Sequence, residues 1–261
     1  MIAAMYTTQL QAGLGMIDET GSLLNLWGEG MGVPELSKLA LDNGVFPTMA
    51  ARRVRNVVAE CFAPRYLVND GQPAVLLQQL KPKIQHNELR QIYFIYTCRA
   101  NEILADFVTQ VYWPFYAAGK SEIQKQDAVD FVVRSNQDGK TKKLWSESTI
   151  KRVSSYLVGC CGDFGLLEGG ARKSTRRFDS FNIQRMAALF LCHELHFAEL
   201  GDNAVAGHSN WRLFGLEKFD VVELMKSLSM DGHLLVQSAG GVVNIGWKYN
   251  NMQEVIDAIG R

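Results

Sequence analysis

The closest approach to a catalytic motif in this sequence is a pair of histidines three residues apart, His193 and His196. On a helix this spacing lets two imidazoles share a metal ion, and Cys192, Glu199 or His208 would complete a ligand set. The pair is not the zincin motif H-E-x-x-H, in which the histidines are four residues apart. We therefore expect two semi-exposed histidines on a helix, with no metal and no cofactor.

Other catalytic patterns are weak or missing. Residues 169–175 (GGARKST) superficially resemble a phosphate-binding loop, but no glycine directly precedes Lys173 and the strand-loop-helix setting is absent. There is no G-x-S-x-G nucleophile elbow, and the scattered acidic residues form no outstanding pair. Five cysteines without a C-x-x-C pair indicate reduced thiols, partly buried. We expect a protein that is not an enzyme.

The chemistry that the sequence does favour is contact with phosphates through clustered basic side chains. The formal net charge of the 261 residues is zero, but residues 134–177 carry ten basic and four acidic side chains, a local charge of +6. Residues 178–261 carry six basic and ten acidic side chains, a local charge of −4. Because a partner docks on one face, this local field matters more than the total.

An amphipathic helix is expected to position part of this basic segment. Ser146 suits the N-cap, and Glu147 is favourable in the first turn. The apolar side of the helix comprises Ile150, Val153, Leu157, Cys160 and Cys161, and it is predicted to pack on a helix over residues 121–133. The opposite side carries Ser148, Lys151, Arg152 and Ser155. This division is typical of a recognition helix, whose cations reach phosphates or guanine edges.

A wing is expected after this helix. Residues 165–167 (GLL) resemble the end of a recognition helix, residues 168–170 (EGG) signal a turn, and residues 177–181 alternate like a strand. The basic residues of the wing are Arg172, Lys173, Arg176 and Arg177, and those of the segment before the helix include Lys142 and Lys143. An earlier pair of short helices, over residues 34–44 and 48–62, also resembles a helix-turn-helix and carries Arg52 and Arg55 on its polar face.

The whole chain is predicted to be mainly α, with short β-hairpins. A helical domain over residues 1–119 would contain a long helix over 87–112 and end at the boundary Ala117–Lys120, after which the charge pattern changes. A winged-helix-like domain over residues 120–261 would end in a helix-hairpin-helix extension with its hairpin at 233–249 and its last helix at 252–259. No signal peptide and no run of 18 apolar residues is found, which favours a cytoplasmic protein without a membrane span.

Several segments together resemble the BrxA family. They are residues 6–8 (YTT), 90–99 (RQIYFIYTCR), 148–153 (STIKRV), 165–167 (GLL) and 233–259. BrxA proteins are components of BREX (bacteriophage exclusion) systems. The resemblance implies an N-terminal region similar to the NusB fold, a winged-helix-like C-terminal region, and a role in phage defence beside a methyltransferase and an ATPase. It implies no catalytic residues.

The leading hypothesis is a non-enzymatic accessory protein that binds double-stranded DNA, mainly through backbone phosphates, and works with other BREX proteins. Its predicted contact residues are Lys142, Lys143, Ser148, Lys151, Arg152, Ser155, Arg172, Lys173, Arg176 and Arg177, extended by Arg52 and Arg55. Two alternatives remain open. The chain would be a protein-interaction scaffold whose basic segment is incidental, or its NusB-like helices would bind RNA.

Overall fold

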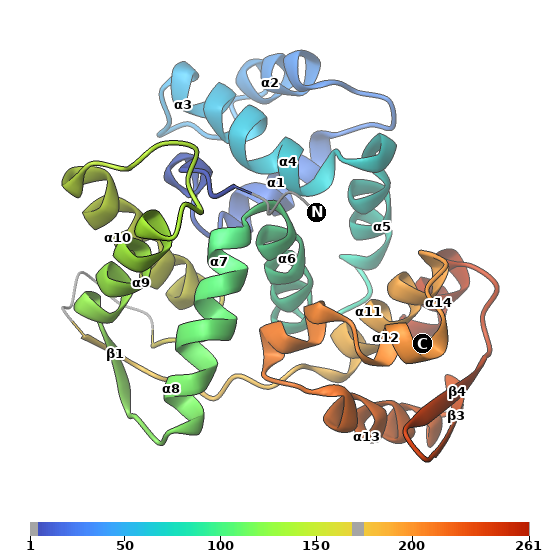
Figure 1. Ribbon diagram of the computed structural model, residues 1–261. Coiled ribbons are helices and arrows are strands. Elements are labelled where there is room, and N and C mark those ends of the chain that lie inside the picture. Colours follow the sequence, from blue (N-terminus) through green and yellow to red (C-terminus); the bar gives the residue numbers. More distant parts are fainter. Residues whose placement is uncertain (1–4, 169–174, 261) are drawn as a thin grey trace. The chain divides into compact units, whose positions relative to one another are not determined.

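The computed structural model describes residues 5–168 and 175–260, and it is mainly helical, as predicted (Figure 1). The chain divides into two compact units. Unit 1 comprises residues 1–75 and 96–181, and unit 2 comprises residues 76–95 and 182–261. This division does not coincide with the predicted boundary between residues 119 and 120, because the basic segment groups with the N-terminal helices. The change in charge after residue 119 therefore separates two parts of the surface of unit 1 and is not a boundary between units.

The first part of unit 1 is a series of short helices. They are η1 (Gln9–Ala12), α1 (Ile17–Leu26), α2 (Val33–Asp42), α3 (Ala51–Asn56), the π-helical η2 (Val57–Phe62), α4 (Ala63–Tyr66) and η3 (Asn69–Gly71). The predicted helix over residues 48–62 thus begins at Ala51 and continues past Pro64. Pro64 follows the π-helical η2 in a continuous run, because Phe62 and Ala63 both have helical backbone angles, and the wider π turn accommodates the missing N–H.

The predicted long helix over residues 87–112 is interrupted. It forms α6 (His86–Ala100), α7 (Glu102–Phe107), the π-helical η4 (Val108–Tyr112) and α8 (Trp113–Ala117). The break lies at Asn101, whose φ of −136° and ψ of 83° are not helical and whose side-chain amide donates to the Thr97 carbonyl at 2.9 Å. Pro114 again follows a π-helical turn, η4, and the backbone of Tyr112 and Trp113 is helical, so this proline does not end the helix.

The basic segment of unit 1 lies on two helices and two short strands. These are β1 (Glu122–Gln124), α9 (Lys125–Gln137), α10 (Glu147–Asp163) and β2 (Thr175–Arg177). The predicted helix over 121–133 therefore begins with a strand. β2 pairs antiparallel with β1. Its other edge pairs with the chain that follows α10. There the backbone nitrogen of Glu168 donates to the Arg177 carbonyl at 2.9 Å, and the backbone nitrogen of Asp179 donates to the Leu166 carbonyl at 3.0 Å.

Unit 2 contains most of α6 and the C-terminal elements. The latter are α11 (Arg185–Phe197), α12 (Asp202–Ala206), η5 (Ser209–Phe214), α13 (Lys218–Ser229), β3 (Leu234–Ala239), β4 (Val242–Trp247) and α14 (Met252–Ile259). The remaining helix, α5 (Gln72–Leu80), begins in unit 1 and ends in unit 2. The predicted hairpin and last helix are confirmed. Gly240 and Gly241 both have positive φ, which a tight two-residue hairpin turn of type I′ requires.

The cores of the two units are rich in aromatic residues. In unit 1, Tyr66, Phe107, Tyr112 and Phe164 are fully buried. In unit 2 the fully buried aromatic side chains include Tyr93, Phe94, Phe190 and Trp211. All five cysteines are free and buried, more completely than the partly buried thiols predicted.

Candidate nucleic-acid interface

Helix α10 is fixed in unit 1 through its N-cap and its apolar side. Ser146 Oγ accepts from the Thr149 nitrogen at 3.4 Å, as an N-cap does, so this prediction is confirmed. Val153 and Leu157 are buried, and Ser154 Oγ donates to the Ala128 carbonyl of α9 at 3.2 Å. The predicted packing of this helix on the preceding one is therefore observed, and it turns the opposite side of α10 to solvent.

The exposed side of α10 presents one free cation and one paired cation. Arg152 is exposed and has no side-chain partner among the described residues. Lys151 Nζ lies 2.5 Å from Glu147 Oε1, one helical turn away. The hydrogen bond from Lys151 lowers the pKa of Glu147, so this carboxylate stays ionised at neutral pH. Exposed pairs of this kind are weak, and a phosphate can replace the carboxylate as the partner of Lys151.

The two serines predicted on this face hydrogen-bond locally. Ser155 Oγ donates to the Lys151 carbonyl at 2.9 Å, and Ser148 Oγ lies 3.0 Å from Ser146 Oγ. Neither hydroxyl carries a charge. They leave room beside the cations for a phosphate or a base to approach closely.

The loop between α9 and α10 is held at both ends by one side chain, that of the buried Asn136. Asn136 Oδ1 accepts from Thr141 Oγ1 and from the backbone nitrogen of Trp145, each at 2.9 Å. Between these two anchors, Lys142 and Lys143 are exposed and have no partner among the described residues. The loop therefore presents both lysines from a fixed backbone, directly before α10.

The first residue of the basic cluster, Lys140, has a different role. Its Nζ donates to Asp106 Oδ2 at 2.8 Å and to the Tyr6 hydroxyl at 3.1 Å. Tyr6 also donates to Asp106, and its backbone nitrogen donates to the Lys140 carbonyl at 2.7 Å. Burial and the neighbouring Asp106 raise the pKa of Tyr6, so the phenol keeps its proton. Lys140 thus ties the loop to α7 and to the N-terminal segment.

The structure places the four basic residues of the predicted wing in different environments or leaves them undescribed. Arg172 and Lys173 lie outside the described residues. Arg177 is exposed, at the end of β2. Arg176 is half-buried, and its guanidinium lies so close to Gly162 of α10 that a Cβ atom there would overlap with it. Arg177 is therefore available to a ligand, whereas Arg176 packs against the end of α10.

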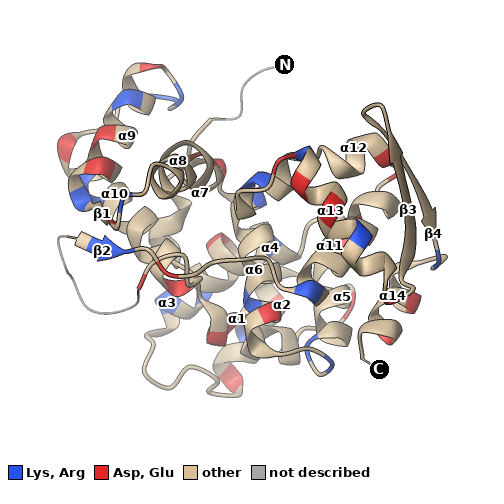
Figure 2. Ribbon diagram, turned by 90° about the horizontal axis from the view of Figure 1, so that it is seen from below, with Lys and Arg blue, Asp and Glu red and all other residues tan. Residues whose placement is uncertain are grey.

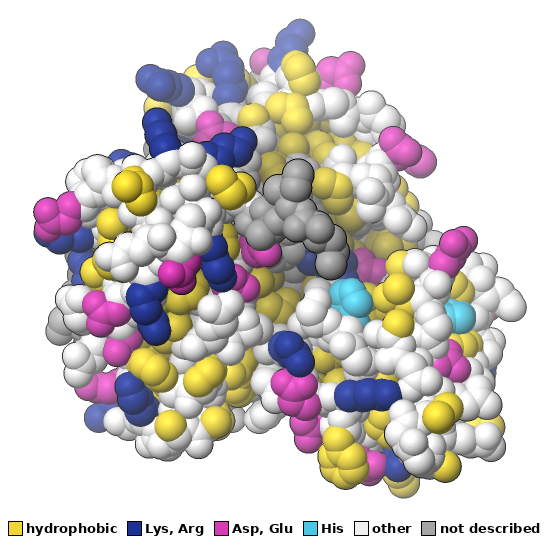
Figure 3. Space-filling view, in the orientation of Figure 1, with side chains coloured by type: hydrophobic (Ala, Val, Ile, Leu, Met, Phe, Trp, Pro, Cys, Tyr) yellow, Lys and Arg dark blue, Asp and Glu magenta, His cyan; other side chains and the backbone are white. Residues whose placement is uncertain are grey.

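Helix α3 adds two exposed arginines, Arg52 and Arg55. Both views place α3 and α10 on the same side of unit 1 (Figures 1 and 2), and Figure 2 shows basic residues on α3 and β2. In the space-filling view, Lys and Arg side chains gather over α3 (Figure 3). Seven exposed cations of unit 1, on α3, the loop between α9 and α10, α10 itself and β2, are together called the basic face: Arg52, Arg55, Lys142, Lys143, Lys151, Arg152 and Arg177. Exposed acidic residues, among them Glu147 and Asp130, lie on α10 and α9.

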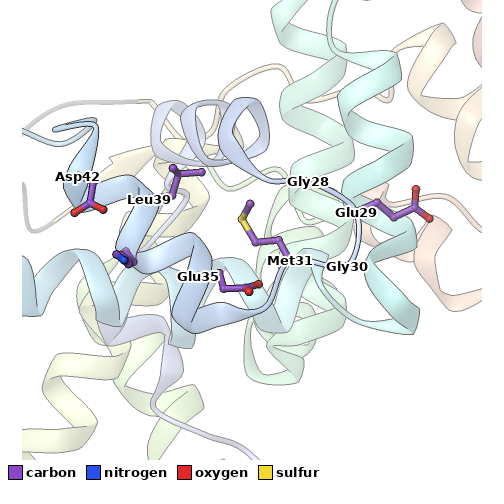
Figure 4. Close-up of a pocket in the computed structure, with 8 residues that line it drawn as sticks. Gly28, Glu29, Gly30, Met31, Glu35, Leu39 and Asp42 are labelled. Carbon is purple, nitrogen blue, oxygen red and sulfur yellow. The ribbon is translucent and has the colours of Figure 1, made fainter.

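An open groove of about 580 Å³ on unit 1 has the opposite charge (Figure 4). It lies between α2 and the turn at residues 28–31, which is closed by a hydrogen bond from the Met31 nitrogen to the Gly28 carbonyl. Its charged lining consists of Glu29, Glu35, Asp42 and Lys38. Three carboxylates and one ammonium disfavour an anionic ligand, so we do not assign this groove to nucleic acid.

Of the histidine pair of α11, His196 is partly exposed, as predicted, whereas His193 is not. His193 is fully buried, which corrects the prediction of a semi-exposed side chain. Its Nδ1 lies 2.9 Å from the Leu189 carbonyl, and burial lowers its pKa to about 4. His196 instead stacks on Trp247, with ring centroids 4.2 Å apart. Among the described residues, no group of three or more His, Cys, Asp or Glu side chains has the arrangement of a metal site.

Sequence reasoning missed the residues that position the basic face. Asn136 and Trp145 are nine residues apart, whereas Tyr6 and Lys140 are 134 apart. No periodicity or capping pattern predicts such contacts. The prediction of no membrane span, made because the sequence has no run of 18 apolar residues, agrees with the helices of the structure. Within residues 5–168 and 175–260, no helix is both long and apolar enough to cross a bilayer.

The chain is thus a mainly helical protein of two compact units, and unit 1 carries the basic face. The model of the BrxA family matches residues 4–191, most of the chain, and the chain therefore belongs to the BrxA family. Membership identifies it as a BREX phage-defence protein.

A solved structure supports the fold alone. It is the crystal structure of an uncharacterized protein from Magnetospirillum magneticum, with a TM-score of 0.62 and 13% sequence identity. The match covers 80% of this chain and 97% of that one. No curated protein matches the sequence significantly.

Proposed function

We propose that this BrxA-family protein is a non-enzymatic, cytoplasmic accessory protein that binds double-stranded DNA through its basic face and works with other BREX proteins. The observation that carries the proposal is the basic face itself. Six of its seven cations have no partner among the described residues, and the seventh, Lys151, has only an exposed carboxylate. Exposed cations without partners, concentrated on a few elements of one unit, favour contact with a polyanion.

The arrangement around α10 supports a winged helix-turn-helix as the binding element. A strand, β1, is followed by two packed helices and then by the antiparallel segments 166–168 and 175–179. In proteins of that class the second helix enters the major groove and the hairpin contacts the neighbouring backbone. In the proposed complex α10 lies in the groove, and the paired segments 166–168 and 175–179 lie near the phosphates beside it.

The chemistry of the face favours phosphates over base edges. Its seven members are all lysines or arginines, and none is an asparagine or glutamine that would read adenine. Each phosphate that a lysine or arginine neutralises releases counterions, so the affinity is expected to fall steeply with salt. We therefore propose binding with little sequence preference from this face.

Charge reversal on α10 tests the site. In a mobility-shift titration of a DNA duplex at rising salt, Lys151→Glu/Arg152→Glu is expected to abolish the shift. Ala at all four wing positions, Arg172, Lys173, Arg176 and Arg177, is expected to weaken it. The control Arg212→Glu/Lys226→Glu makes the same charge change on unit 2 and should bind like the unaltered protein. Unchanged binding by both α10 and wing variants would refute the site, and preferential competition by RNA would favour RNA as the ligand.

A second candidate function, docking of other BREX proteins, rests on unit 2. Phe219 and Met230 of the α13 region are 75% and 88% exposed, and Leu235 and Val242 of the hairpin are each 61% exposed. Lys218 Nζ donates to the Gly241 carbonyl at 2.9 Å, which joins the start of α13 to the hairpin turn. Exposed apolar side chains on neighbouring elements are typical of protein contacts. Co-purification with another BREX protein that is lost in Phe219→Ser/Val242→Ser would support this function.

A further inference from the structure

The tip of the loop between α9 and α10 carries an apolar side chain, Leu144, beside its two lysines. Leu144 is 76% exposed, whereas the other large hydrophobic residues exposed in the described part of unit 1 are Met5, Val68 and Tyr116, at 37%, 42% and 46%. A leucine this exposed adds almost no buried area to the folded chain. Its side chain is free to bury that area against a ligand.

The backbone that carries Leu144 is fixed before any ligand binds. Asn136 holds Thr141 and Trp145 on either side of the tip, and Trp145 is the residue next to Leu144. The carbonyl of Lys140 accepts from Tyr6 at 2.7 Å, which anchors the start of the loop a second time. A contact made by a fixed side chain avoids the entropic cost of ordering a flexible loop on binding.

The position of Leu144 follows from the geometry of α10. It lies two residues before the N-cap, Ser146. In helix-turn-helix proteins the N-terminal residues of the recognition helix contact base edges, and Leu144 lies in the loop directly before that end of α10. Lys142 and Lys143, on the same tip, would remain with the phosphates at the edge of the groove, while the uncharged Leu144 has no attraction to them.

Only one base edge in the major groove offers an apolar group, the C5-methyl of thymine. We infer that Leu144 packs against thymine methyl groups in the major groove and gives a face that otherwise grips phosphates a preference for thymine. The inference rests on the proposed function, since it assumes that α10 enters the groove of a DNA duplex. Its substrate class is duplex DNA with thymines under the loop tip.

Replacing thymine by uracil tests this contact, because uracil lacks the methyl group but keeps the same hydrogen-bonding edge. Two A·T-rich duplexes of identical sequence, one with thymine and one with uracil, would be titrated by fluorescence anisotropy at low salt. The unaltered protein is expected to prefer the thymine duplex by about fourfold for each methyl buried. Leu144→Ser should bind both duplexes equally, with an affinity close to that of the unaltered protein for uracil DNA.

A matched variant separates the contact from other effects of uracil. Val68→Ser also removes an exposed apolar side chain from unit 1, outside the basic face, and should keep the thymine preference. A change in duplex shape caused by uracil would affect all three proteins alike. Equal binding of both duplexes by the unaltered protein, or a preference retained in Leu144→Ser, would overturn the inference while leaving the proposed function standing. Absence of binding to either duplex would overturn both.

Discussion

Glu147 and Lys151 form an ion pair on the exposed side of α10, with 2.5 Å between Oε1 and Nζ. The Glu147 carboxylate thus partly neutralises Lys151 of the basic face and adds a negative charge to the exposed side of α10. Glu147→Gln is therefore expected to strengthen DNA binding. The slope of log affinity against log salt should change little, because Lys151 already exchanges this carboxylate for a phosphate on binding.

Anisotropy titrations at several salt concentrations measure both quantities. Glu223→Gln is the control, because Glu223 pairs with Lys226 on α13 at 2.7 Å and lies in unit 2. It should leave the affinity and the slope unchanged. An unchanged affinity in Glu147→Gln would indicate that α10 does not face the DNA.

Asn136 is predicted to matter for stability and for binding. Asn136→Ala leaves the Trp145 nitrogen and the Thr141 hydroxyl without their acceptor, which is expected to lower the free energy of unfolding by about 1–3 kcal/mol. It also frees the loop that carries Lys142 and Lys143, so DNA binding should weaken. Asn136→Asp keeps the accepting oxygen but loses the donor to the Trp145 carbonyl, 3.4 Å from Nδ2, so it should restore only part of the stability. Urea denaturation and anisotropy check the two effects, and full affinity in Asn136→Ala would show that the loop need not be fixed.

Burial of His193 predicts a loss of stability in mild acid. Its pKa is about 4 in the folded protein and about 6.5 when unfolded, so the unfolded chain takes up the proton first. The stability is therefore full above pH 6.5 and is lost as the pH falls toward 4. Between pH 7 and pH 5 this one group should cost about 2 kcal/mol.

Urea denaturation of His193→Leu at both pH values measures this contribution. The variant should lose less stability than the unaltered protein over the same interval. The pKa values of His196 and His233 are also lowered by burial, so a smaller loss of the same sign remains. His86→Gln, at an exposed position, is the control. An identical pH dependence in His193→Leu would contradict the burial of this imidazole.

The cysteines are predicted to be unreactive in the folded protein. All five are buried, and burial raises the pKa of Cys160 to about 12, which leaves almost no thiolate at pH 8. A thiol-specific reagent such as dithionitrobenzoate should therefore react negligibly with the native protein and with all five thiols after unfolding. Rapid labelling of a native thiol would show that part of this core is open.

Local patterns in the sequence predicted local structure well. The N-cap at Ser146, the apolar side of α10, the two-glycine hairpin turn and α14 all depend on residues within a few positions of one another. Such signals act through propensity, capping and periodicity, and the structure confirms them.

Contacts between distant residues explain what the sequence did not predict. The pairing of β1 with β2 joins Glu122 to Arg177, and a strand of three residues carries too little pattern to be recognised. Two prolines, Pro64 and Pro114, favour helix ends by their type alone, but each follows a π-helical turn that lets the helix continue, and no sequence pattern predicts these turns. Among the candidate contact residues, exposure could be inferred from helix faces, but the packing of Arg176 against Gly162 depends on tertiary structure.

The salt dependence of binding to a DNA duplex tests the central proposal most directly. Fluorescence anisotropy of the unaltered chain between roughly 50 and 200 mM salt should give a steep linear fall of log affinity against log salt. Lys142→Ala/Lys143→Ala should reduce the slope by about two, one for each phosphate that is no longer neutralised. No binding at the lowest salt, or the same slope in both proteins, would contradict the assignment of the basic face to DNA.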